Sequence, residues 1–92
     1  TTYTASHILV DEEAKALEIC KEIEEGLAFE DAARKYSKDP SAANGGKLGT
    51  FPKGVMVKEF QDGLEELEVG EISKPVKSQF GYHLIKLENI NN

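Results

Sequence analysis

A glycine-rich stretch that also carries large apolar side chains sets the strongest limit on how this 92-residue chain folds. Between Gly45 and Gly54, four glycines and Pro52 exclude a continuous helix, because both residue types destabilise a helix interior. The apolar side chains of this stretch and the residues after it are Leu48, Phe51, Val55, Met56 and Phe60. Such a segment builds either the floor of a pocket or a hairpin whose side chains fill the core, and both interpretations remain open here.

The length and charge of the chain limit the classes of protein to which it can belong. Ninety-two residues are enough for a single domain, 1–92, with a modest core. Eleven basic residues against 17 acidic ones give a net charge of −6, which argues against nucleic acid or an anionic membrane surface as a partner. No apolar run approaches the roughly 18 residues of a membrane-spanning helix. Cys20 is the single cysteine, so an internal disulfide is excluded.

Hydrophobic periodicity predicts an α+β domain with the order β-α-α-β-α-β-β. Asp11 is expected to cap the first helix, whose apolar stripe includes Cys20 as a small core residue rather than a nucleophile. Strands are predicted over 3–10, 48–51 and 82–88, with a broken edge strand over 72–77. The first helix ends near Gly26, and two further helices are predicted over 29–36 and 57–67. Residues 38–47 are predicted as a polar loop and residues 89–92 as a frayed end.

The two histidines of the chain lie in its first and last predicted strands. The first and last strands of a small α+β domain often pair at the centre of the sheet, so His7 and His83 are expected to come together there. A mutual hydrogen bond would then fix their tautomers. Asp39, in the polar loop, either supplies a carboxylate to the same cavity or forms a turn before Pro40, and its spacing does not decide between the two.

Other chemistries have little support in the sequence. The segment from Gly45 to Gly49 lacks the spacing of a phosphate-binding loop or a dinucleotide fingerprint. His7, Asp39 and His83 match the composition of a two-histidine, one-carboxylate metal site, but no local ligand spacing supports one, and we expect neither a metal nor another cofactor.

Five segments, in this order along the chain, resemble the parvulin family of peptidyl-prolyl cis/trans isomerases. They are Ser6-His7-Ile8-Leu9-Val10, Gly45-Gly46-Lys47-Leu48-Gly49-Thr50-Phe51, Met56-Val57-Lys58-Glu59-Phe60, Gly70-Glu71-Ile72-Ser73-Lys74-Pro75-Val76 and Phe80-Gly81-Tyr82-His83-Leu84-Ile85-Lys86. The resemblance runs from about residue 5 to residue 88. One such segment alone would be weak, whereas five in the family's order form a specific signal.

The resemblance implies a four-stranded antiparallel sheet surrounded by about three to four helices, with a shallow active site on one face of the sheet. It places His7 and His83 as the paired central histidines, Asp39 at a position held by aspartate or cysteine, and Ser78 at a hydroxyl position near the pair. The residues that it assigns to substrate binding are Leu48, Met56 and Phe60 around the prolyl ring, with Phe51 as a pocket-wall or core aromatic and Phe80 nearby.

One departure from the family bears on substrate choice. Phosphate-directed parvulins carry a long basic loop after the first strand, whereas here Val10 is followed directly by Asp11, Glu12 and Glu13. Phosphorylated residues before proline are therefore expected to be disfavoured. The short loop is more similar to bacterial or archaeal parvulins and to the isomerase domains of extracytoplasmic foldases, and the start without methionine favours a domain of a larger foldase.

The predicted function is acceleration of rotation about Xaa-Pro bonds in unfolded or flexible polypeptides, which assists protein folding. The alternative is a peptide-binding or chaperone module with little turnover. Proline-containing polypeptides are the expected partners, and we expect a monomer without membrane contact from this domain. The compartment stays open, with an extracytoplasmic location favoured over a cytoplasmic one.

Overall fold

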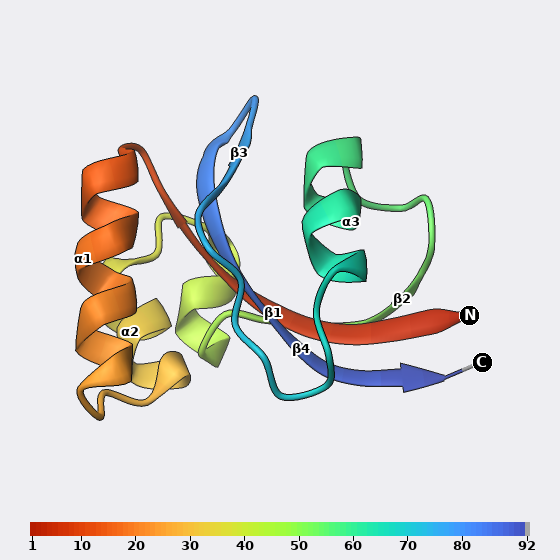
Figure 1. Cartoon of the computed structure of the whole chain (residues 1–92), viewed down its shortest axis with the longest axis horizontal. Helices are drawn as coiled ribbons and strands as arrows, with labels where there is room; N and C mark the ends of the chain where they lie inside the picture. The colour runs from red at the N-terminus through yellow and green to blue at the C-terminus, as the bar shows by residue number, and fades with distance from the viewer. Residues whose placement is uncertain (92) are drawn as a thin grey trace.

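The computed structural model, which describes residues 1–91, contains a four-stranded antiparallel sheet with α-helices on both faces (Figure 1). The strands lie in the order β2-β1-β4-β3. Along the chain the elements are β1 (Thr2–Val10), α1 (Glu13–Glu24), α2 (Phe29–Tyr36), the 3-10 helix η1 (Pro40–Asn44), β2 (Lys47–Pro52), α3 (Lys58–Glu65), β3 (Val76–Ser78) and β4 (Gly81–Asn91). The predicted class, sheet and order of elements are confirmed, and η1 is an addition to them.

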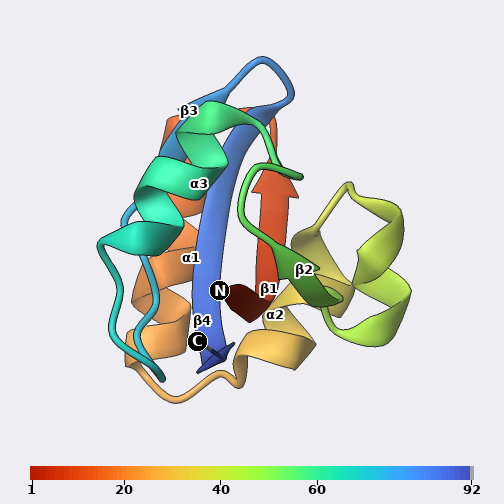
Figure 2. The ribbon, with the colours of Figure 1, turned by 90° about the vertical axis from the view of Figure 1, so that its right-hand side faces the viewer.

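The first and last strands pair along their whole length in the middle of the sheet (Figure 2). Their outer ends bring the two ends of the chain together, with Thr2 opposite Asn91. The predicted frayed end is therefore wrong for residues 89–91, which belong to β4, while residue 92 lies outside the described residues. Polar residues form a strand here because β1 starts at Thr2 and supplies backbone partners that the composition of the tail does not reveal.

Alternation along the two central strands divides the core into two layers. One layer lies between the sheet and helices α1 and α2, and the other lies between the sheet and α3 (Figure 1). The buried residues of the first layer are Ile8, Val10, Ala16, Ile19, Phe29, Ala32, Ala33 and Leu84. Those of the second layer are Tyr3, Ala5, Phe51, Phe60, Leu64, Ile85 and Leu87. His7 and His83 share the face of Ala5 and Ile85, as the alternation predicts, and the structure shows that this face is the one on the α3 side.

The start of α1 differs from the prediction that Asp11 caps it. Glu12 occupies the cap position and its side chain makes no cap hydrogen bond, so α1 begins one residue later than expected. The Asp11 carboxylate instead forms an ion pair with Lys38, which lies 27 residues further along the chain. A long-range cation thus takes the carboxylate that local sequence assigned to the helix.

The segment predicted as a polar loop over 38–47 contains η1. Asp39 caps this short helix, because its carboxylate accepts a hydrogen bond from the backbone N–H of Ser41 at 2.9 Å, and Pro40 follows at the first helical position. Both features are ordinary helix-start signals, but the five residues that follow are too few to show a periodicity. The longest helix among the described residues has 12 residues, and none is long and apolar enough to cross a membrane.

Gly46 allows the end of η1 to lie against β1, and this contact generates a prediction. The His7 backbone N–H donates to the Gly46 carbonyl at 2.9 Å, and a Cβ on Gly46, whose φ is +83°, would lie 2.4 Å from the His7 carbonyl oxygen. Gly49 has a similar φ of +78° with no atom within 4 Å of such a Cβ. We expect Gly46→Ala to lower the free energy of unfolding by about 3 kcal/mol or more, and Gly49→Ala by about 1 kcal/mol.

Urea unfolding of the two variants beside the parent chain measures both losses. Because the two glycines have similar positive φ angles, the difference between the variants reports the close approach to His7. Equal losses would show that the contact between Gly46 and β1 adds nothing beyond the backbone conformation.

Candidate active site

The register of β1 against β4 brings the two histidines together. His7 is opposite Ile85 and His83 is opposite Leu9, so the imidazoles are diagonal neighbours on one face of the sheet. Their Nδ1 atoms lie 3.0 Å apart, and the ring centroids are 5.2 Å apart with an interplanar angle of 18°. The expectation that the two imidazoles meet is confirmed, and their part in catalysis stays a prediction.

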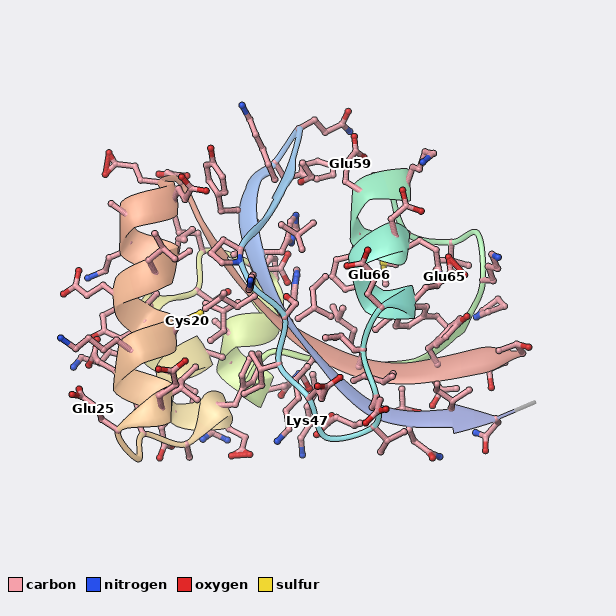
Figure 3. All side chains as sticks on the ribbon, viewed as in Figure 1. Cys20, Glu25, Lys47, Glu59, Glu65 and Glu66 are labelled. Carbon is pink, nitrogen blue, oxygen red and sulfur yellow. The ribbon has the colours of Figure 1, made fainter. Side chains whose placement is uncertain are left out.

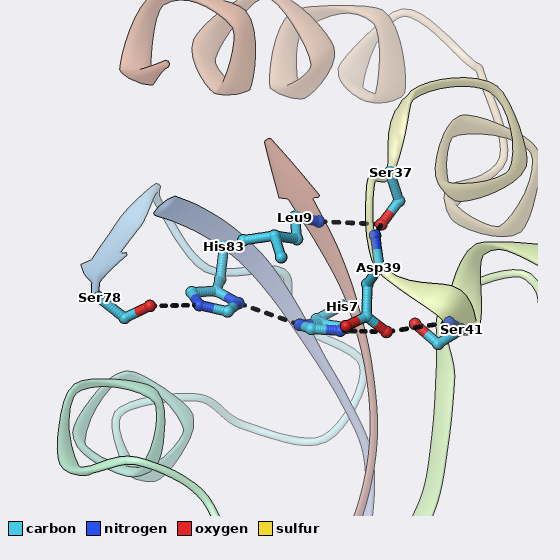
Figure 4. Close-up of polar contacts among 7 residues, drawn as sticks. All are labelled: His7, Leu9, Ser37, Asp39, Ser41, Ser78 and His83. Atoms are coloured by element: carbon cyan, nitrogen blue, oxygen red, sulfur yellow. Dashed lines mark hydrogen bonds and ion pairs between the residues drawn. The ribbon is translucent and has the colours of Figure 1, made fainter. Parts of the chain in front are cut away.

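Each end of the histidine pair has a further polar partner, as Figure 4 shows. On the β3 side, the Ser78 Oγ lies 2.7 Å from the His83 Nε2. On the η1 side, the Asp39 Oδ2 atom lies 3.3 Å from the His7 Nε2, a close polar contact that is not aligned as a hydrogen bond. Asp39 thus fills both roles that its spacing left open, because the same oxygen also caps η1.

One proton arrangement satisfies these contacts when both imidazoles are neutral. Asp39 has only acceptors as a carboxylate, so the proton of His7 belongs on Nε2, and its Nδ1 accepts from the Nδ1–H of His83. The Nε2 of His83 is then an acceptor for the Ser78 hydroxyl, whose oxygen accepts from the Phe80 backbone N–H at 3.2 Å. In the series from Ser78 through His83 and His7, every donor hydrogen points toward Asp39. The hydrogen bonds of the site therefore have one fixed direction.

Burial determines the charge states of the groups in this hydrogen-bonded series. His7 and His83 are only 5% and 4% exposed, and burial of the imidazole, together with repulsion from His7, lowers the pKa of His83 to about 4 against a weaker opposing effect of Asp39. Burial alone would raise the pKa of Asp39, but hydrogen bonds from Ser41 and the contact with His7 outweigh it and leave the pKa below its usual value. At neutral pH the site therefore combines a neutral His83 with an ionised Asp39.

Beside the histidine pair lies an open, mostly apolar cavity of about 360 Å³. Its wall comes from β1, β2, α3 and β4, from the connection between α2 and η1, from the loop after β2 and from the β3–β4 turn. The lining residues are His7, Leu9, Asp39, Leu48, Val55, Met56, Val57, Phe60, Phe80 and His83. The volume falls at the lower end of the range for small-molecule sites, and it accommodates a small ring rather than a large ligand.

Phe60 lines the apolar cavity and also contacts the histidine pair. Its ring lies edge-on to both imidazoles, with centroid distances of 5.6 Å to His7 and 5.6 Å to His83. Phe51, predicted as part of the substrate pocket, does not line the cavity. It packs behind Phe60 at 6.4 Å and against Tyr3 at 6.3 Å, so it belongs to the core. The correction has a simple cause: β2 pairs with β1 and turns the Phe51 ring into the layer under α3.

The structure brings together the other predicted site residues and adds three. Leu48, Met56, Phe60 and Phe80 all line the cavity, and Phe80 is more than half exposed at its rim. The residues that sequence reasoning did not assign to the site are Leu9, Val55 and Val57. Leu9 had a signal, since it shares the strand face of His7. Within residues 1–91, no group of three or more histidine, cysteine, aspartate or glutamate side chains is arranged to hold a metal ion.

Comparison with known proteins gives the chain a family context. The Rotamase family, described as the PPIC-type PPIASE domain, matches residues 7–89. The chain is 52% identical over 87 residues to foldase protein PrsA 1 of Bacillus cereus, covering 94% of this chain and 30% of that protein. It is 49% identical to foldase protein PrsA of Bacillus subtilis over 83 residues, covering 89% of this chain and 28% of that protein.

Solved structures show the same fold. The peptidylprolyl isomerase PrsA of Bacillus anthracis superposes with a TM-score of 0.97 at 43% identity, over 99% of this chain and 42% of that one. NmPin, the parvulin of Nitrosopumilus maritimus, gives a TM-score of 0.86 at 45% identity, over 96% of both chains. The chain therefore spans about a third of the foldases that it matches and nearly the whole of the archaeal protein.

The lowered pKa of His83 predicts how stability depends on pH. The folded protein binds this proton only near pH 4, whereas the unfolded chain binds it near pH 6.5, so the unfolded state takes up the proton first as the pH falls. The free energy of unfolding should therefore be highest above pH 6.5 and fall by about 1–3 kcal/mol as the pH drops to 4.

Urea unfolding at a series of pH values measures this slope, with a His83→Gln variant as the comparison. The variant should show a flatter profile between pH 6.5 and pH 5, above the range in which most carboxylates titrate. Parallel profiles would contradict a neutral, buried His83.

Proposed function

This chain belongs to the PPIC-type, or parvulin, family of peptidyl-prolyl cis/trans isomerases, and we propose that it accelerates Xaa-Pro rotation in unfolded or flexible polypeptides as one domain of a longer foldase. The observation that carries this proposal is the apolar cavity beside the buried histidine pair. The family implies proline-containing polypeptides as substrates. The matched foldases are about three times as long as this chain, which supports a place within a larger protein.

The chemistry needs no bond to be broken. Rotation about a peptide bond faces a barrier of roughly 18–20 kcal/mol, and the two isomers of an Xaa-Pro bond differ by only about 0.5–1 kcal/mol. A protein that binds the twisted amide better than either planar form lowers this barrier. The site must therefore fix the prolyl ring and leave the preceding carbonyl free to swing.

The apolar wall is suited to fixing the ring. Leu48, Met56 and Phe60 meet in the cavity from β2, the following loop and α3, so the ring would be held on three sides. The same wall excludes water from the amide nitrogen, and a drier environment weakens the charge-separated resonance form that keeps the amide planar. Phe80, at the exposed rim, would border the swinging part of the substrate.

We assign Ser78, His83, His7 and Asp39 a role in positioning and in setting the local polarity, rather than in covalent attack. Asp39 Oδ2 already accepts from Ser41 and lies against His7, and Ser78 is engaged with His83. These contacts fix both imidazole rings beneath Phe60, and they place an ionised carboxylate at one side of the cavity. The result is a rigid floor with a fixed electrostatic gradient under the amide.

Exchange NMR on a short Ala-Leu-Pro-Phe peptide tests the proposed activity directly. A catalytic amount of the chain should make cis/trans exchange much faster than the uncatalysed reaction, which takes on the order of tens to hundreds of seconds. Peptide line broadening without faster exchange would instead identify a holding module with little turnover, and the isomerase proposal would be withdrawn.

Met56 offers the cleanest test of the prolyl pocket. It lines the cavity but is only partly buried, unlike Phe60, whose removal would also open the core. We expect Met56→Ala to lower kcat/KM about ten- to a hundredfold, because the lost apolar contact is worth roughly 1.5–3 kcal/mol. Val69→Ala, which removes a side chain that is exposed and lines no described cavity, serves as the control and should change neither activity nor stability.

An unfolding curve on the same samples shows that the Met56 variant is folded. An unchanged kcat/KM in a folded Met56→Ala protein would remove this residue from the substrate pocket.

The charges near the cavity predict discrimination against acidic residues before proline. Asp39 is the ionised group of the lining, and the Lys38 ammonium beside it is already paired with Asp11. A carboxylate or phosphate there meets repulsion, and none of the described residues that line the cavity is a lysine or an arginine. We expect kcat/KM for Glu-Pro to be about tenfold below that for Leu-Pro, and phosphoserine-Pro to be lower still.

The same exchange assay on the three peptides gives these ratios, and added salt should narrow them. A preference for Glu-Pro or phosphoserine-Pro would overturn this account of specificity.

We also propose that the domain acts as a monomer. The large hydrophobic side chains exposed among the described residues are Leu17, Val55, Val69 and Phe80. Val55 and Phe80 belong to the candidate active site, so a self-association surface would have to use few remaining apolar side chains.

A further inference from the structure

A second groove lies between α1 and residues 72–75 and is larger than the candidate active site. Its volume is about 750 Å³, against about 360 Å³ for the cavity beside the histidines. Its floor is apolar: Leu17, Cys20 and Ile23 come from α1, while Ile72 and Pro75 come from the opposite wall. Leu17 is 53% exposed, so the groove is open to solvent rather than filled by the core.

This groove is separate from the candidate active site. The two cavities share no lining residue. Helix α1 covers the opposite face of the sheet from α3, which borders the histidine pair (Figure 1). Figure 3 shows Cys20 on the side of α1 that faces the rest of the molecule, while Glu25 points outward at the far end of the helix.

The backbone at the edge of the groove is suited to an extended chain. The Ser73 N–H donates to the Ile85 carbonyl at 2.7 Å, and the Leu87 N–H donates to the Glu71 carbonyl at 3.2 Å. Because bonding alternates along an antiparallel strand, the intervening Ile72 directs its N–H and carbonyl away from the sheet. Among residues 1–91, neither the Ile72 nor the Lys74 N–H has a backbone partner. An unpaired edge of this kind binds extended polypeptides by strand addition.

The charges along the groove specify what the extended chain would carry. Glu13 and Glu24 stand near the two ends of the α1 wall, and neither forms an ion pair within the described residues. The neighbouring acids on α1 are occupied, since Glu18 pairs with Lys15 and Glu22 accepts from the Tyr36 hydroxyl. The two free carboxylates are eleven positions apart on α1, or roughly 16 Å, which an extended chain covers in about five to six residues. Because successive side chains of an extended chain point to opposite sides, two side chains that both face α1 must be an even number of residues apart, which here is six.

The Lys74 side chain borders the groove but does not neutralise its two free carboxylates. It lines both this groove and the smaller cavity on the α3 side of the same segment, so it stands on the crest between the two. Its exposed ammonium forms no ion pair with either Glu13 or Glu24. The free carboxylates therefore remain available to a ligand at the ends of the groove.

We propose that this groove binds an extended polypeptide segment with apolar side chains at alternate central positions and a basic side chain near each end, six residues apart and on the same side of the segment as the apolar ones. The apolar side chains lie over Leu17, Cys20 and Ile23, the backbone pairs with the free edge at Ile72, and the basic side chains meet Glu13 and Glu24. The site is independent of proline and of the isomerase pocket.

A proline-free peptide, acetyl-Lys-Thr-Leu-Thr-Val-Thr-Lys-amide, tests the proposal on the whole 92-residue chain, because its lysines and apolar residues share one side when it is extended. In an NMR titration we expect a Kd of about 1 mM or below, with amide shifts at residues 17–24 and 72–75 and none at His7 or His83. Bound peptide should also slow alkylation of Cys20, the single thiol of the chain, about threefold at saturation, because the thiol lies in the groove.

Charge reversal provides the matched comparison. The double variant Glu13→Lys with Glu24→Lys should raise the Kd of the lysine-flanked peptide about tenfold and favour acetyl-Glu-Thr-Leu-Thr-Val-Thr-Glu-amide. Glu25→Lys, outside the groove, should change either affinity less than about twofold. Isomerase turnover on Ala-Leu-Pro-Phe should stay unchanged in both variants.

Three outcomes would overturn the proposal: no binding of the lysine-flanked peptide up to several times the expected Kd, shifts confined to the histidine cavity, or equal affinities of the two peptides for the charge-reversed variant. Because the isomerase assay is run on the same proteins, loss of turnover and loss of groove binding are told apart.

Discussion

The antiparallel pairing of β1 with β4 is the constraint on which the rest of the structure depends. It joins the two ends of the chain, and its register makes His7 and His83 diagonal neighbours with their Nδ1 atoms 3.0 Å apart. A slip of one residue would turn one imidazole to the opposite face of the sheet and carry buried aliphatic side chains with it. The two hydrophobic layers therefore hold the register that the polar site needs, and the site adds little hydrophobic stabilisation of its own.

Burial of two imidazoles is tolerable because each end of the pair has a partner. The Ser78 hydroxyl donates to His83 at the β3 end, and the Asp39 carboxylate lies 3.3 Å from the His7 Nε2 at the η1 end. The Asp39 carboxylate sets the direction of these hydrogen bonds, since it has no proton to donate. Gly46 lets η1 lie close enough to β1 for the contact between Asp39 and His7. An unpartnered imidazole at this depth would cost more than the hydrogen bonds of the pair return. The polar site thus depends on a helix of only five residues.

Sequence reasoning succeeded where a feature depends on periodicity or on a long motif. The strand faces of His7 and His83 follow from alternation, and the apolar residues after Gly45 follow from the glycine-rich stretch together with the family resemblance. It failed where distant residues compete for a group. The Asp11 carboxylate pairs with Lys38, a contact that no local pattern reveals. Phe51 is apolar and adjacent to the pocket stretch, so only the pairing of β2 shows that it faces the core.

The segment from Ile72 to Ser78 shows how one short edge can serve two sites. Its end belongs to the polar chain through Ser78, while its beginning forms one wall of the second groove. Gly63 lets α3 approach this edge closely, because a Cβ there would lie 2.8 Å from the Val76 side chain. The edge is therefore held by α3 on one side and left open on the α1 side. A polypeptide bound along the open side would lie on the segment that continues through β3 to Ser78, the hydrogen-bond partner of His83.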